Sequence, residues 1–141
     1  MVTNISHSPA DTLALGEAWG QAVKPGTLIG LRGDLGAGKT QLVKGLAQGL
    51  GIAARVVSPT FALVNVYIEG RLPLAHLDLY RLDTIEQIRS AGLEEYLYPQ
   101  GVTVIEWAER MGRYPLPPTA WNISITGDGD APRTISINDL E

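Results

Sequence analysis

The feature that most constrains the fold of this chain is a glycine-rich segment at residues 33–40, with the sequence GDLGAGKT. It matches the pattern G-x-x-x-x-G-K-[ST], whose glycines let the backbone curl until successive N–H groups point at phosphate oxygens. The pattern carries this meaning between a buried strand and a helix. Residues 27–31 are apolar enough for such a strand, and helical spacing runs from Gly38 to about Leu50. The segment therefore predicts a phosphate-binding loop in an α/β fold.

The same segment contains the side chains that phosphate chemistry needs. Lys39 supplies a mobile cation for the outer phosphates, and the Thr40 hydroxyl is suited to bind Mg²⁺. The N-terminus of the following helix adds the positive end of its dipole. We therefore expect a nucleotide and Mg²⁺ as ligands. The expected nucleotide-binding residues of this segment are Gly33, Asp34, Leu35, Gly36, Ala37, Gly38, Lys39, Thr40 and Gln41.

An acid at the end of a neighbouring apolar strand should complete the magnesium site. Glu106 follows Val-Thr-Val-Ile, and Asp78 follows Leu-Ala-His-Leu. Because Glu106 ends the more uniformly apolar run, we assign it to the metal beside Thr40, and Asp78 to placing an attacking water. The predicted catalytic residues are Lys39, Asp78 and Glu106. For each acid the alternative is a structural carboxylate that caps a helix or pairs with Arg81.

Two further positions are candidates for contact with the nucleotide. Ser58 and Thr60 lie in the loop after the helix, where a hydroxyl often senses the last phosphate of a nucleotide. The alternative is a turn with a buried Phe61. Trp107 follows Glu106 and belongs either beside the nucleotide or in the core. A structural role is the stronger interpretation for four other residues, although the last could reach a ribose or base: Trp19, His76, Trp121 and Arg133.

Strand and helix patterns alternate along the chain. Strands are expected at residues 2–6, 55–57, 61–68, 72–79, 102–105 and 121–126, with the second arm of a terminal hairpin around 135–137. Ser8 can cap a first helix and Asp83 a later one. This pattern predicts a mixed central sheet flanked by helices, with a C-terminal β-hairpin, in one domain spanning residues 1–141. On the first helix, apolar residues recur with helical spacing on one face: Ala10, Leu13, Ala14, Ala18, Trp19, Ala22 and Val23.

Composition narrows the function further. The 141 residues carry 11 basic and 15 acidic side chains, a net charge of −4, which disfavours a free-standing nucleic-acid-binding protein, with no DNA partner expected, but not a nucleic-acid role inside a complex. Without cysteine, and with two histidines, a thiolate or multi-histidine zinc site is excluded. We find no stretch apolar enough to span a membrane and no signal peptide, so we expect a cytoplasmic protein.

Several segments together resemble the TsaE (YjeE) family of small ATPases. They are TLALG at residues 12–16, LRGDLGAGKT at 31–40, SPTF at 58–61, HLDLYRL at 76–82 and VIEW at 104–107. The resemblance runs nearly from end to end. It implies a P-loop NTPase fold and slow hydrolysis of ATP to ADP in bacterial tRNA threonylcarbamoyladenosine biosynthesis. It also implies action with TsaB and TsaD, with tRNA reached through that complex.

The resemblance also implies a role for each matching residue. Thr40 and Glu106 would bind Mg²⁺, while Asp78 would be needed for hydrolysis. Lys39 and the loop amides would bind the phosphates, and Trp107 would lie near the nucleotide. Gln41 departs from the family, where a second hydroxyl residue is common.

The residues by themselves lead only to a Mg²⁺-dependent nucleotide-binding module. Two alternatives to an ATPase that serves a partner complex therefore stay open. One is a small-molecule P-loop kinase, which usually carries an arginine-bearing lid that the scattered arginines here do not form. The other is a binding switch in which ATP and ADP set partner affinity and hydrolysis is incidental.

Overall fold

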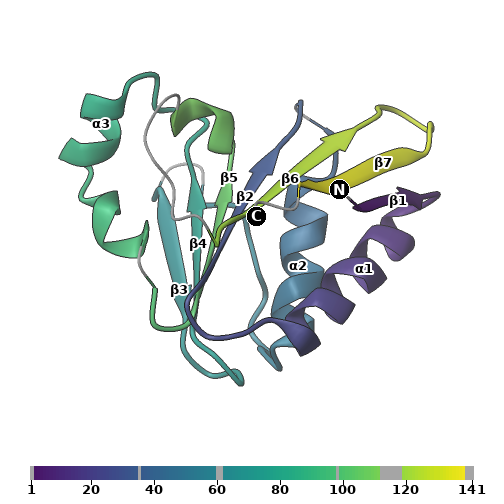
Figure 1. Cartoon of the computed structure of the whole chain (residues 1–141), viewed down its shortest axis with the longest axis horizontal. Helices are drawn as coiled ribbons and strands as arrows, with labels where there is room; N and C mark the ends of the chain where they lie inside the picture. Colours follow the sequence, from purple (N-terminus) through teal and green to yellow (C-terminus); the bar gives the residue numbers. More distant parts are fainter. Residues whose placement is uncertain (1, 35, 60–61, 98, 112–118, 139–141) are drawn as a thin grey trace.

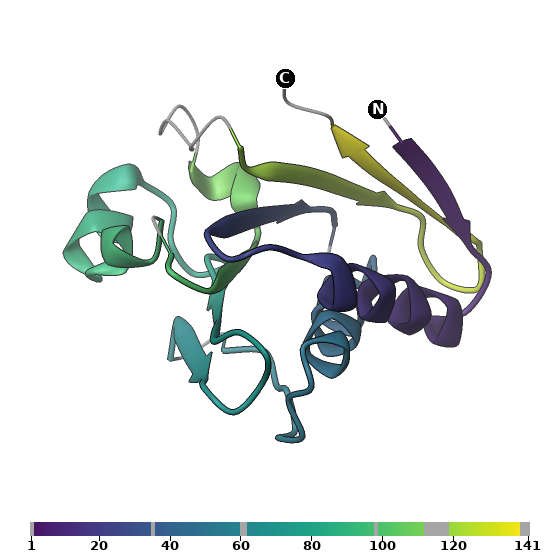
Figure 2. The same cartoon turned by 60° about the horizontal axis from the view of Figure 1, so that its bottom comes forward.

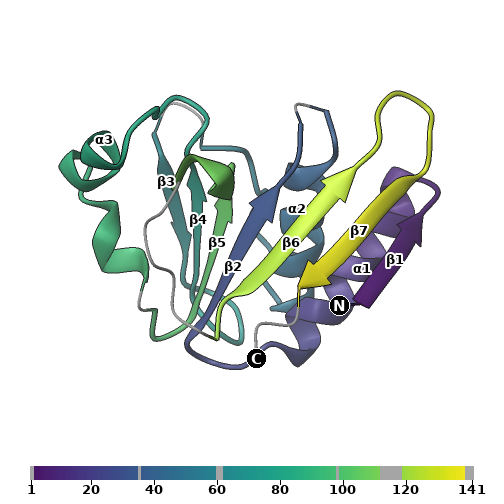
Figure 3. The ribbon, with the colours of Figure 1, turned by 45° about the horizontal axis from the view of Figure 1, so that its top comes forward.

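The computed structural model describes residues 2–34, 36–59, 62–97, 99–111 and 119–138. At its centre is a seven-stranded mixed sheet in the order β1-β7-β6-β2-β5-β4-β3, seen face-on in Figure 3. This confirms the predicted mixed α/β class, and antiparallel pairing of β6 with β7 confirms the C-terminal hairpin. The strands are β1 (Val2–Ser6), β2 (Thr27–Arg32), β3 (Val64–Tyr67), β4 (Leu74–Asp78), β5 (Val102–Glu106), β6 (Trp121–Thr126) and β7 (Arg133–Asn138).

Helices cover both faces of the sheet (Figures 1 and 2). On one face, α1 (Pro9–Ala22) and α2 (Lys39–Gly49) bury one apolar core; on the other, α3 (Ile85–Ser90) and the 3₁₀ helices η1 (Leu93–Leu97) and η2 (Ala108–Met111) bury a second. Both cores share the central strands, because side chains alternate between the faces of a strand. Among the described residues, no helix is long and apolar enough to cross a membrane.

The centre of the sheet is parallel, and this arrangement determines where the polar side chains meet. β2 pairs in parallel with both β5 and β6, and β4 pairs in parallel with β5. In this register Glu106 lies opposite Asp78 on one side and opposite Leu31, next to the phosphate loop, on the other. The loop and both predicted acids therefore meet at the carboxyl edge of the sheet, where open α/β sheets bind ligands.

α1 and α2 pack through glycines, and the alanines of the predicted apolar face of α1 take no part in the contact. Ala10, Ala14, Ala18 and Ala22 are exposed, so the prediction that they share the apolar face of α1 with the buried residues is wrong. The buried residues of α1 are Thr12, Gly16 and Gly20. A Cβ on Gly16 would lie 2.4 Å from the carbonyl oxygen of Leu42, and one on Gly20 would lie 2.2 Å from that of Leu46. The two backbones therefore approach too closely for any side chain at these positions.

Two local predictions of secondary structure are also wrong. Residues 55–57 form no strand and belong to the connection between α2 and β3. The cap of α3 is Thr84, not Asp83. The Thr84 hydroxyl accepts from the backbone N–H of Gln87, and the side-chain oxygen of Gln87 accepts from the backbone N–H of Thr84. This reciprocal capping box satisfies two N–H groups at the helix end, which explains why the cap lies one residue later. Ser8 caps α1 as predicted.

Candidate nucleotide-binding site

The predicted phosphate loop connects β2 to α2. Gly36 and Gly38 have φ angles of 83° and 105°, which are rarely adopted by residues with a side chain. Gly38 is also the N-cap of α2. These two glycines therefore let the chain turn sharply from a buried strand into the start of a helix. Leu35, which belongs to the predicted binding set, lies outside the described residues, as do Thr60 and Phe61.

Lys39 is folded back over the loop. Its ammonium donates to the carbonyl oxygens of Gly33 and Asp34, and it lies 3.8 Å from the centroid of the Trp107 ring, a cation–π contact. Burial lowers the pKa of Lys39, while the negative charges of neighbouring carboxylates, first Glu109 and then Glu106, act in the opposite direction. Lys39 is therefore held beside the loop by two backbone carbonyls and the face of an aromatic ring.

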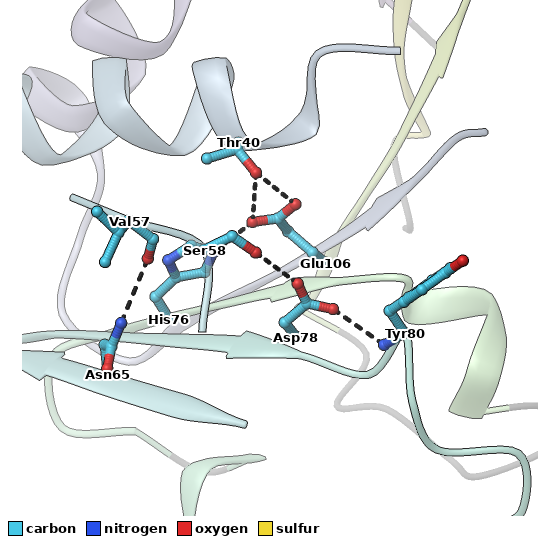
Figure 4. A network of polar contacts seen from close by, with 8 residues as sticks. All are labelled: Thr40, Val57, Ser58, Asn65, His76, Asp78, Tyr80 and Glu106. Atoms are coloured by element: carbon cyan, nitrogen blue, oxygen red, sulfur yellow. Dashed lines mark hydrogen bonds and ion pairs between the residues drawn. The ribbon is translucent and has the colours of Figure 1, made fainter. Parts of the chain in front are cut away.

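The two residues predicted to share a metal ion are in direct contact (Figure 4). The Thr40 hydroxyl lies 2.9 and 3.1 Å from the two carboxylate oxygens of Glu106 and donates to them. Glu106 is buried at the end of β5, and Thr40 lies in the first turn of α2. Hydroxyl and carboxylate oxygens are ligands that Mg²⁺ prefers, so this pair fits the ion. Among the described residues, no group of three His, Asp or Glu could hold a metal alone.

His76 is also part of this network, a position that was not predicted from the sequence. Its Nε2 lies 2.5 Å from Glu106 Oε2, and the residue is completely buried. His76 lies two positions before Asp78 on β4, so both side chains are on the sheet face that α2 covers. The two-residue separation of His76 and Asp78 in the sequence could have indicated that the two side chains share a face of the strand. The predicted structural role of His76 is compatible with this contact, which supports the predicted metal ligand Glu106.

Asp78 is fixed by two donors. Its Oδ2 accepts from the Ser58 hydroxyl at 2.6 Å, and its Oδ1 accepts from the backbone N–H of Tyr80 at 2.9 Å (Figure 4). Only 2% of Asp78 is exposed. Ser58 therefore brings the loop that precedes β3 to the site, in the region predicted to sense the last phosphate.

These side chains surround one cavity at the carboxyl edge of the sheet. Its lining contains most of the predicted residues, namely Gly36, Ala37, Gly38, Lys39, Thr40, Gln41, Ser58, Asp78, Glu106 and Trp107. Tyr80, which was not predicted, also lines it. Trp107 is half-buried and adopts a left-handed backbone with φ 61°, and its ring lies 5.0 Å from that of Tyr80. Positive φ is uncommon for a bulky residue and is concentrated at functional sites. The Gln41 amide donates to the carbonyl oxygen of Pro9, which links α2 to the start of α1.

Arg133, at the start of β7, is the second residue whose place was not predicted. Its guanidinium donates to the carbonyl oxygens of Ala37 and Gly36, at 3.1 and 3.3 Å, from the side of the loop nearest the terminal hairpin. Nothing in the sequence indicates this contact, because it joins residues 96 positions apart. Trp19 and Trp121 pack edge to face against each other, with ring centroids 6.2 Å apart, and both rings lie against the core. This agrees with the structural role predicted for them.

Comparisons with known proteins all point to the same family. The family model described as "Threonylcarbamoyl adenosine biosynthesis protein TsaE" matches residues 6–135. The chain is 50% identical over 113 residues to a "tRNA threonylcarbamoyladenosine biosynthesis protein TsaE" of Synechocystis sp., covering 70% of this chain and 68% of the relative. It is 44% identical to the protein of that name from Treponema pallidum, covering 94% and 97% of the two chains.

A solved structure resembles the whole fold. The crystal structure of Bacillus subtilis YdiB superposes with a TM-score of 0.82 at 36% sequence identity, covering 99% of this chain and 86% of the other. Because the match includes nearly all of this chain, it extends beyond the phosphate loop to the terminal hairpin.

Proposed function

The chain belongs to the TsaE family of tRNA threonylcarbamoyladenosine biosynthesis proteins, and from this premise we propose that it binds ATP with Mg²⁺ and hydrolyses it slowly. The reaction supports threonylcarbamoylation of the adenosine next to the anticodon, carried out with TsaB and TsaD in the cytoplasm. tRNA is reached through that complex. The observation that carries the proposal is the contact between Thr40 and Glu106 beside a loop that can bind phosphates.

The loop and Lys39 would bind the phosphates. Loop amides donate to phosphate oxygens, and the dipole of α2 adds a positive potential at the same place. Lys39 would exchange its contacts with the carbonyls of Gly33 and Asp34 for the outer phosphates. Since an ammonium forms stronger bonds with phosphate anions than with neutral carbonyls, this exchange is favourable.

Thr40 and Glu106 would hold Mg²⁺, which when bound neutralises charge on the phosphates. Asp78 would orient the attacking water through a carboxylate kept in place by Ser58 and Tyr80. Its burial and two donors fix the direction of its oxygens, which is what a water-positioning residue requires.

A partner is expected to set the rate. Among the described residues, no arginine lines the cavity, and an arginine at such a site is worth roughly 10³–10⁵ in rate where it is used. The isolated chain should therefore be slow. TsaB and TsaD would either supply a missing charge or order the loop that contains Ser58.

The test is phosphate release from Mg-ATP by the purified chain, alone and with TsaB and TsaD added. Slow release that changes when the complex is added supports the proposal. Tight ATP binding without release in either sample would instead favour a nucleotide-dependent binding switch. Transfer of phosphate to a small acceptor would favour a kinase.

A further inference from the structure

We propose that Arg133 is a positioning residue for the phosphate loop. Its guanidinium holds the loop peptide whose N–H group must face the phosphates. The inference rests on the proposed nucleotide-binding function and adds a role for the C-terminal hairpin, which contains none of the residues of the phosphate loop or the candidate metal pair.

Arg133 joins two loops through backbone oxygens. Nε donates to Ala37 O at 3.1 Å, and Nη2 donates to Gly36 O at 3.3 Å. On the other side, Nη1 donates to Ala131 O at 2.5 Å and Nη2 to Gly129 O at 3.1 Å. One side chain therefore clamps the phosphate loop to the turn between β6 and β7.

The clamp determines which way a peptide unit points. The C=O of Ala37 and the N–H of Gly38 belong to one peptide, and the described chain contains no cis peptide bond. In a trans peptide these two groups point in opposite directions. Arg133 takes the Ala37 carbonyl on the hairpin side, so it turns the Gly38 N–H away from the hairpin. A flipped peptide would instead present a partially negative oxygen to the phosphates.

Packing fixes the Ala37 side chain, which is buried in the core, but it does not hold the two glycines on either side of Ala37. A Cβ built on Gly36 or on Gly38 would meet no atom within 4 Å. Both residues are glycines at positive φ, which rotate more freely than any other residue. Hydrogen bonds from a cation are stronger than those from a neutral donor, and they also polarise the peptide that accepts them. Arg133 is thus suited both to fix the peptide and to strengthen its N–H as a donor.

The chemistry requires arginine rather than any cation. A guanidinium offers five N–H donors in a planar fork, whereas a lysine ammonium offers three on a flexible stem. Four carbonyl oxygens on two loops match the planar fork. Arg133 also lines a second cavity beside the loop, together with Ser8, Gln41 and Asp130. The experiment must therefore separate an effect on the phosphates from contact with the nucleoside.

The test compares ATP with pyrophosphate, which has no nucleoside. Affinities of the unaltered chain, Arg133→Gln and Arg133→Lys are measured by calorimetry with Mg²⁺. We expect Arg133→Gln to weaken both ligands by roughly tenfold, the loss typical of a hydrogen bond to a charged group. Arg133→Lys keeps the charge and the aliphatic stem, so it should fold even where Arg133→Gln does not, and should still bind both ligands less tightly than the unaltered chain.

The control is Arg89→Gln, an exposed arginine on α3 whose Nε lies 3.7 Å from Glu94. It should leave both affinities unchanged. Unchanged binding by the Arg133 variants, full restoration by lysine, or a loss confined to ATP would each overturn the inference. Failure of the unaltered chain to bind ATP would instead reject the proposed function.

Discussion

At the scale of single residues, the Glu106 carboxylate depends on its neighbours. It is buried at the end of β5, and burying a carboxylate is costly unless donors surround it. Thr40 contacts it from α2 and His76 from β4. Thr40 would also bind the ion, so His76 is the residue that can keep Glu106 oriented while Thr40 turns to the metal. His76 should therefore affect metal binding without touching the metal.

We expect His76→Leu to raise the Mg²⁺ concentration needed for half-maximal ATP hydrolysis by about 10-fold or more, as loss of an outer partner of a metal ligand usually does. The measurement is a Mg²⁺ titration of phosphate release. Thr103→Val is the matched control, because Thr103 is buried on β5 and its hydroxyl has no hydrogen-bond partner among the described residues. An unchanged Mg²⁺ requirement in His76→Leu would contradict the positioning role.

Trp107 should report nucleotide binding. Its ring contacts the Lys39 ammonium, which we expect to move to the phosphates when ATP binds. ATP should therefore change the tryptophan emission of the unaltered chain. Trp107→Phe should abolish this change, while Trp121→Phe should keep it, because Trp121 packs against Trp19 and does not line the cavity. Loss of the signal in Trp121→Phe instead would place the nucleotide elsewhere.

At the scale of elements, the contact between α1 and α2 depends on missing side chains. A Cβ on Gly45 would lie 2.2 Å from the carbonyl oxygen of Leu13. We expect Gly45→Ala to lower the free energy of unfolding by about 1–3 kcal/mol through overpacking. This loss should appear although alanine is favoured over glycine within a helix by about 1 kcal/mol. Urea unfolding measures it, with the exposed Gln48→Ala as control. Equal or higher stability of Gly45→Ala would show that the helices can separate without cost.

The elements also show how far sequence patterns reach. The phosphate loop and the strands that end in Asp78 and Glu106 were predictable, because local spacing specifies them and parallel pairing brings strand ends together. The buried face of α1 was not, because hydrophobicity cannot reveal a contact made by Gly16 and Gly20. The contact between Arg133 and the phosphate loop was not predictable either, because it depends on the pairing of β6 with β2, which places the hairpin beside the loop.

At the scale of the whole molecule, every part of the sheet except its two outermost strands contributes to one edge. The loop follows β2, and the acids end β4 and β5, which lie side by side in the sheet (Figure 3). The terminal hairpin contacts the loop through Arg133. Binding of a nucleotide would therefore change contacts made by elements that are far apart in the sequence. Such an arrangement suits a protein whose nucleotide state is communicated to other proteins.

Asp78→Asn tests whether the proposed complex with TsaB and TsaD needs ATP hydrolysis. Asparagine keeps the size of the side chain, but a neutral amide cannot accept a proton or orient water as a carboxylate does. We expect the variant to bind ATP within about twofold of the unaltered chain, since Asp78 is not among the phosphate-binding groups. It should support one round of tRNA modification with TsaB and TsaD but not repeated rounds. Modified tRNA counted against the amount of complex measures this. Repeated modification at the normal rate would mean that the complex needs only the bound nucleotide and not its hydrolysis.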